Sequence, residues 1–138
     1  IVSPVKNSVK GLDELIKHIE QEQVERVLYP LIPQEWQKEI AYYTNDEFSD
    51  KIIKDGNIIY TNTDEINRLY NSDAYMAVDG GIIRACDHLS ACVETYLSHT
   101  CGITTHTLQN GNRELYEKYR IAKIGGIDFG CLFDYFRI

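Results

Sequence analysis

Residues 80–99 read GGIIRACDHLSACVETYLSH, and this stretch predicts a helix with enough apolar side chains to pack into a core. At 100° per residue, one stripe of this helix collects the apolar residues Ile82, Cys86, Leu89, Val93, Tyr96 and Leu97. Asp87 lies outside the stripe. Its own face combines small, polar and apolar side chains, namely Ile83, Ser90, Ala91 and Glu94. Such a face is not an obvious solvent face, so the carboxylate of Asp87 needs an explanation.

Helices are also predicted on the N-terminal side of this stretch. Ser3 and Pro4 are typical of the N-cap and first residue of a helix, and Pro30 and Pro33 end the long amphipathic pattern that follows. A second helix begins at Pro33. Within it, Trp36 is expected to fill a core or an interface.

A β-hairpin is predicted around residues 51–60. Two short isoleucine-rich runs flank Asp55-Gly56, a pair of residues that favours a two-residue hairpin turn. The alternative is a short helix over residues 46–54 with Gly56 after its C-terminus, because the sequence DEFSDKII also has helical spacing.

The rest of the chain again favours helices. Thr63 and Asp79 are expected to cap a short helix and the central helix, respectively. A further helix is expected over about residues 104–121, and Gly125-Gly126 indicates a tight turn. We therefore expect an all-α fold with a small hairpin around residues 51–60.

Length and composition limit the function classes. A chain of 138 residues is expected to form one domain. Its net charge of -7 argues against a nucleic-acid partner, because binding the phosphate backbone needs a basic surface. No apolar run approaches the roughly 20 residues that span a bilayer, and no signal-peptide pattern is present at the start. We expect a soluble, cytoplasmic protein with no membrane partner.

The four cysteines do not predict a metal site. None belongs to a CxxC pair, which is the spacing typical of structural zinc sites. On one helix, Cys86 and Cys92 would lie about 9 Å apart along the axis and point in different directions, so they cannot form a disulfide. We expect buried, reduced thiols.

Two interpretations of Asp87 stay open at this point. It is either a partner of a lysine or arginine, or a ligand of a divalent cation. A single carboxylate does not hold such a cation tightly, so the second interpretation needs further ligands. Glu94 lies about 10 Å further along the helix, and His88 points about 100° away. Spacing alone therefore gives no complete active site.

Three stretches carry a resemblance to a known family: IVSPVKNSV at residues 1–9, RACDHLSACVETYLS at residues 84–98 and IGGIDFGCLFDYF at residues 124–136. Together they resemble the C-terminal part of HD-domain metal-dependent phosphohydrolases, in the branch of the 5′-deoxynucleotidase-like proteins. The resemblance implies an HD-type helical bundle that binds a divalent metal through a histidine, an adjacent His-Asp pair and a distant helical aspartate. Asp87 matches that last aspartate.

The resemblance also implies that residues 1–138 form only the C-terminal part of a single HD-type domain. In the family, the His-Asp pair lies upstream of the segment that IVSPVK resembles, and no His-Asp dipeptide occurs in this sequence. The other ligands are therefore expected on an N-terminal segment of the same protein.

The implied activity is hydrolysis of phosphate monoesters, and nucleoside 5′-monophosphates in particular, by a metal-activated water. The metal is Mn, Co, Mg, Zn or Fe, because one carboxylate does not distinguish them. Lys6 is a candidate for binding the substrate phosphate. A homodimer is also expected. The alternative is a non-catalytic helical module for dimerisation or partner binding.

We predict that the chain of residues 1–138 alone binds the catalytic metal weakly, because it carries one of the expected ligands. Metal analysis of the purified chain after dialysis checks this. A tight, stoichiometric ion held wholly within these residues would contradict it.

Overall fold

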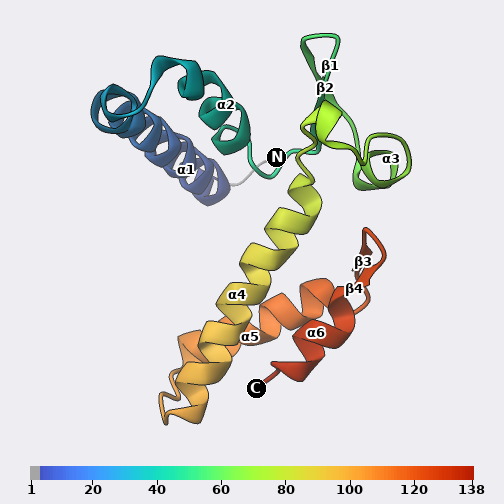
Figure 1. Ribbon diagram of the computed structural model, residues 1–138. Coiled ribbons are helices and arrows are strands. Elements are labelled where there is room, and N and C mark those ends of the chain that lie inside the picture. Colours follow the sequence, from blue (N-terminus) through green and yellow to red (C-terminus); the bar gives the residue numbers. More distant parts are fainter. Residues whose placement is uncertain (1–3) are drawn as a thin grey trace. The chain divides into compact units, whose positions relative to one another are not determined.

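The computed structural model describes the backbone of residues 4–138 and the side chains from Gly11 onward (Figure 1). The chain divides into two compact units, Ile1–Asn45 and Asp46–Ile138. Helices dominate the described residues, and the strands pair into short antiparallel hairpins. This confirms the predicted all-α fold class with a small hairpin, whereas the single domain stays a prediction. Within residues 4–138, no helix combines the length and apolar character needed to span a bilayer.

The first unit contains two α-helices and the turns that join them. Its elements are α1 (Pro4–Gln23), a π-helical turn (Val24–Leu28), a 3₁₀ turn (Tyr29–Leu31) and α2 (Gln34–Thr44). Helix α1 begins at Pro4 as predicted, while the expected cap Ser3 lies outside the described residues. Trp36 is 57% exposed, so its assignment to a core is wrong. Its packing at an interface stays a prediction.

The second unit begins with the predicted hairpin, which joins β1 (Lys51–Lys54) to β2 (Asn57–Tyr60) in antiparallel register. Asp55 and Gly56 both have positive φ angles, 53° and 77°, as a type I′ turn requires. The hairpin is thus confirmed, and the alternative helix over residues 46–54 is wrong. Lys51 exchanges two backbone hydrogen bonds with Val78, at 3.0 and 2.8 Å, which fixes the hairpin to the residues before α4.

The remaining elements of this unit are α3 (Thr63–Leu69), a 3₁₀ turn (Asp73–Tyr75), α4 (Gly80–Thr100), α5 (His106–Tyr119), β3 (Lys123–Ile124), β4 (Ile127–Asp128) and α6 (Phe129–Tyr135). The cap of α3 is Asn62, whose side chain accepts from the Glu65 amide at 2.9 Å, so Thr63 was the wrong residue by one position. Gly125 and Gly126 form the predicted turn, with φ angles of 57° and 79°.

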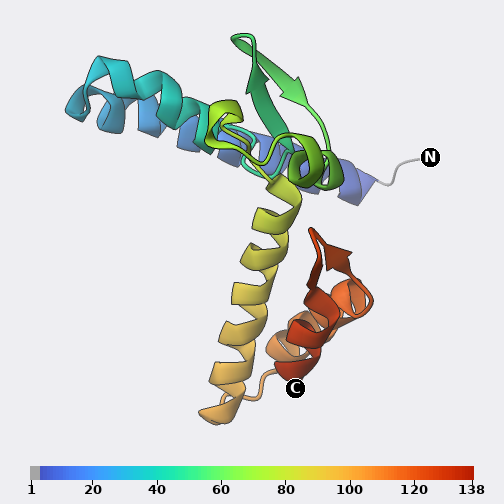
Figure 2. The ribbon, with the colours of Figure 1, turned by 45° about the vertical axis from the view of Figure 1, so that its right-hand side comes forward.

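Helices α4, α5 and α6 lie side by side and enclose the main core (Figures 1 and 2). The buried core residues are Ala85, Cys92, Tyr119, Phe129 and Phe133. The rings of Tyr119 and Phe133 stack with centroids 4.4 Å apart and planes 7° apart. This stacking joins the end of α5 to the middle of α6.

The packed face of α4 agrees with the predicted stripe only in part, since Ile82 and Leu89 pack against the core as predicted. Ala85 and Cys92 are fully buried, whereas Cys86 is exposed and Leu97 is 54% exposed. Small side chains occupy the packed positions because they let neighbouring helices approach closely. The packed face therefore keeps Ile82 and Leu89 of the predicted stripe, and it includes Ala85 and Cys92 in place of Cys86 and Leu97.

The exposure of the cysteines also differs from the prediction. All four cysteines are free, as expected, but only Cys92 is buried. The prediction of buried thiols is wrong for Cys86, Cys101 and Cys131. Cys86 follows Ala85 directly, and one step along a helix turns the side chain by about 100°, away from the packed face.

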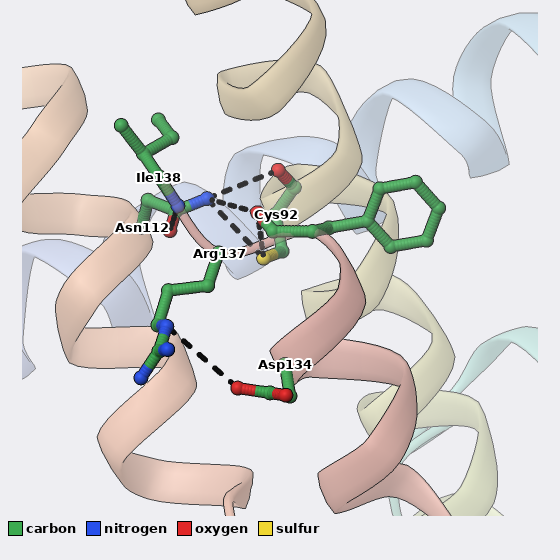
Figure 3. A network of polar contacts seen from close by, with 6 residues as sticks. Cys92, Asn112, Asp134, Arg137 and Ile138 are labelled. Carbon is green, nitrogen blue, oxygen red and sulfur yellow. Dashed lines mark hydrogen bonds and ion pairs between the residues drawn. The ribbon is translucent and has the colours of Figure 1, made fainter.

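Asn112, in the middle of α5, is 1% exposed and hydrogen-bonds three segments (Figure 3). Its amide nitrogen lies 2.8 Å from the Thr95 hydroxyl and 3.0 Å from the Phe136 carbonyl oxygen, and donates to both. Its amide oxygen accepts from the Ile138 backbone amide at 3.1 Å. An asparagine amide has two N–H donors, so these contacts satisfy it.

We predict that Asn112→Ala lowers the free energy of unfolding by about 2–3 kcal/mol, because it removes a buried side chain and leaves the half-buried Phe136 carbonyl and Ile138 amide without this partner. The matched control is Asn110→Ala, an exposed asparagine on the same helix, which should cost less than about 0.5 kcal/mol. Urea unfolding measures both. Equal losses for the two variants would show that the buried network contributes no special stability.

Candidate functional site around Asp87

The start of helix α4 is fixed by a carboxylate cap. Asp79 Oδ1 accepts from the Ile82 amide at 3.4 Å, which confirms the predicted cap. The same oxygen accepts from the Thr63 hydroxyl at 3.0 Å, so the cap also holds the first residue of α3. The start of α4 is therefore fixed to the neighbouring helix α3, and so is the position of the side chains that α4 carries.

Glycine is required at the first position of α4. A Cβ atom built on Gly80 would overlap the backbone carbonyl group of Phe48, which is not a flexible side chain that could move aside. The amide of the next residue, Gly81, donates to Asp50 Oδ1 at 3.0 Å. These contacts seat the N-terminus of α4 against the segment before β1.

Asp87 lies in the middle of this helix, and its side chain is exposed. The residues that share its face are exposed as well, namely Ile83, Ser90, Ala91 and Glu94. The expectation that this face is not a solvent face is therefore wrong for this structure. Within residues 11–138, no lysine or arginine side chain forms an ion pair with Asp87.

The neighbouring histidine belongs to the packed side of the helix. His88 Nδ1 and the Tyr119 hydroxyl share a hydrogen bond of 2.6 Å, and the two rings meet edge to face. Tyr119 is itself buried and stacked on Phe133. His88 is thus a hydrogen-bonded residue at the edge of the core, rather than a second ligand beside Asp87.

Burial favours the uncharged forms of both His88 and Tyr119. It lowers the pKa of His88, and the positive charges of Lys118 and Arg84 lower it further. The charge of Asp87 acts in the opposite direction with a smaller effect on the His88 pKa. Burial also raises the pKa of the Tyr119 hydroxyl. The neutral forms of both groups are the ones suited to a shared hydrogen bond in a half-buried position.

The other histidines do not gather around Asp87. His18 lies on α1 in the first unit, His106 is the exposed first residue of α5, and His99 lies in the last turn of α4. Across residues 11–138, no group of three or more histidine, cysteine, aspartate or glutamate side chains is placed to hold a metal ion. The donor set of these residues therefore does not fit a complete metal site, and Asp87 provides one carboxylate.

Lys6, the candidate for substrate binding, lies within α1, but its side chain is outside the described residues. Its role stays a prediction.

Sequence reasoning also missed two residues that shape the site, Tyr119 and Asn112. Neither belongs to a motif, and their partners on α4 lie 31 and 17 positions away in the sequence.

Comparison with known proteins identifies the family. The profile of the HD domain matches residues 3–116, most of the chain, and the match includes α4 with Asp87. The chain belongs to the HD-domain family. Membership indicates metal-dependent phosphohydrolase activity in general, and HD domains typically bind divalent metals. No curated protein and no solved structure matches the chain.

We predict that Tyr119→Phe lowers the free energy of unfolding by about 1–2 kcal/mol, because His88 loses its partner while the ring stacking is kept. The control is Tyr135→Phe, at a residue that is 75% exposed, and it should change stability by less than about 0.5 kcal/mol. Thermal or urea unfolding compares the two. If Tyr119→Phe matches the control, the hydrogen bond between His88 and Tyr119 contributes nothing to stability.

Proposed function

We propose that this chain carries part of a metal-dependent phosphohydrolase that cleaves nucleoside 5′-monophosphates, in the 5′-deoxynucleotidase-like branch of the HD family. In this proposal Asp87 is one ligand of a divalent cation, which is Mn, Co, Mg, Zn or Fe. The supporting observation is the state of Asp87 in a chain of this family: its carboxylate is exposed and has no lysine or arginine partner among residues 11–138. A carboxylate with a purely structural role would be expected to form an ion pair with a lysine or arginine.

The remaining ligands, in this proposal, come from an N-terminal segment of the same protein. The sequence contains no His-Asp dipeptide, and Asp87-His88 has the reverse order. The reversed pair does not substitute, because His88 is bonded to Tyr119 on another side of α4. Asp87 would act by charge and position, and Lys6 would contact the substrate phosphate.

A second candidate function is a helical module for dimerisation or partner binding. It is favoured by the apolar side chains of α1, since Leu12, Leu15 and Ile19 are each about half exposed, at 56%, 54% and 49%. Exposed apolar residues in a row along a helix are typical of contact surfaces. A homodimer would cover them, as would the N-terminal segment of the first proposal.

The test compares the full-length protein with Asp87→Ala and with the matched control Glu94→Ala. Glu94 is an exposed carboxylate on the same face of α4, about 10 Å further along the axis. Loss of a direct ligand should weaken metal binding and nucleoside monophosphate hydrolysis by at least about 100-fold in Asp87→Ala, while the control keeps both.

Metal content by elemental analysis and phosphate release at saturating metal are the two measurements. Unchanged metal content and rate in Asp87→Ala would exclude Asp87 as a ligand. Absence of hydrolysis in the wild-type protein, with a dimer in solution, would instead support the non-catalytic module.

A further inference from the structure

A groove of about 660 Å³ lies on the second unit, between one face of α5 and the C-terminal residues. It is lined by Gln109, Arg113, Tyr116, Glu117, Arg137 and Ile138. The residues from α5 are spaced by four, three and one positions, so they form one continuous face of that helix. Two of the lining side chains are arginines, which is a local exception in a chain whose net charge is -7.

The walls of the groove are held in place by the buried amide of Asn112 (Figure 3). This amide bonds the Phe136 carbonyl oxygen and the Ile138 backbone amide, which belong to the residues on either side of Arg137. The Arg137 guanidinium carbon lies 4.8 Å from the centre of the Tyr116 ring. The backbone on both sides of Arg137 is thus fixed to α5, and its side chain rests on an aromatic face.

The guanidinium charges in the groove are weakly compensated. Arg113 donates to the neutral Asn110 side chain at 2.9 Å rather than to a carboxylate. Arg137 pairs with Asp134 at 3.6 Å, but both side chains are more than half exposed, and such pairs contribute little. The carboxylate of Glu117 lies 3.1 Å from Arg120, so it already has a positive partner. The guanidinium groups of Arg113 and Arg137 are therefore available to bind an anion.

We propose that this groove binds the phosphate group of a small molecule through Arg113 and Arg137. The planar guanidinium group matches the oxygens of a phosphate with paired hydrogen bonds, and stacking on Tyr116 orients one of the two guanidinium groups. The volume lies within the range of small-molecule sites. This site does not depend on Asp87, on a metal or on the proposed hydrolase activity.

The test uses inorganic pyrophosphate as the probe, in metal-free buffer at low ionic strength, with sodium chloride at matched ionic strength as the reference. Backbone amide signals in NMR titrations report the affinity and the location. We expect saturable shifts around Arg113 and Arg137. Arg113→Gln and Arg137→Gln should each raise the dissociation constant about 5- to 10-fold, the loss expected for a charge-assisted contact in an open groove.

The matched control is Arg68→Gln, an exposed arginine in α3 of the same unit. It removes the same net charge, so an unchanged dissociation constant shows that the effect is local. Arg113 is exposed and donates to Asn110 of its own helix, so its variant is expected to keep the wild-type melting temperature. Equal weakening by all three variants, or shifts that chloride reproduces, would overturn the proposal.

Discussion

The second unit depends on one buried amide, that of Asn112. This amide, carried by α5, bonds the Thr95 hydroxyl of α4 and the backbone of Phe136 and Ile138 after α6. Making all of these hydrogen bonds at once requires the three segments to take one relative position. The apolar side chains of this core supply most of the driving force, but they are non-directional. The hydrogen bonds of the Asn112 amide are directional, and they fix how the three segments are placed.

Local patterns in the sequence predicted local structure well. Asp55-Gly56 predicted the hairpin because both residues tolerate the positive φ angles of its turn, and Asp79 predicted the start of α4 because its carboxylate reaches the amide three residues on. The face on which α4 packs was not predictable in the same way. Hydrophobicity favours Leu97, but the neighbouring helices approach where Ala85 and Cys92 leave room for them. How closely α5 and α6 approach α4 depends on their own side chains as well as on those of α4, so the sequence of α4 alone does not predict it.

The candidate site was predictable to a similar degree. Asp87 was found through a family resemblance, since its spacing to other ligand types within the chain indicated no metal site. The contact between His88 and Tyr119 spans 31 positions, and no periodicity links the two residues. For the same reason, the role of Asn112 had no signal in the sequence. A helix pattern reports which side chains share a face, but it does not report which distant segment covers that face.

The choice of the packed side of α4 also determines how Asp87 can act. Ala85 and Cys92 turn one side of the helix toward α5 and α6, and His88 is held at the edge of that side by Tyr119. The carboxylate of Asp87 is about 140–160° away from the two packed positions, so it faces outward. Any group that joins Asp87 in a site must then approach from the exposed face, past Ser90 and Ala91. Their small side chains leave a second segment room to come close to the carboxylate.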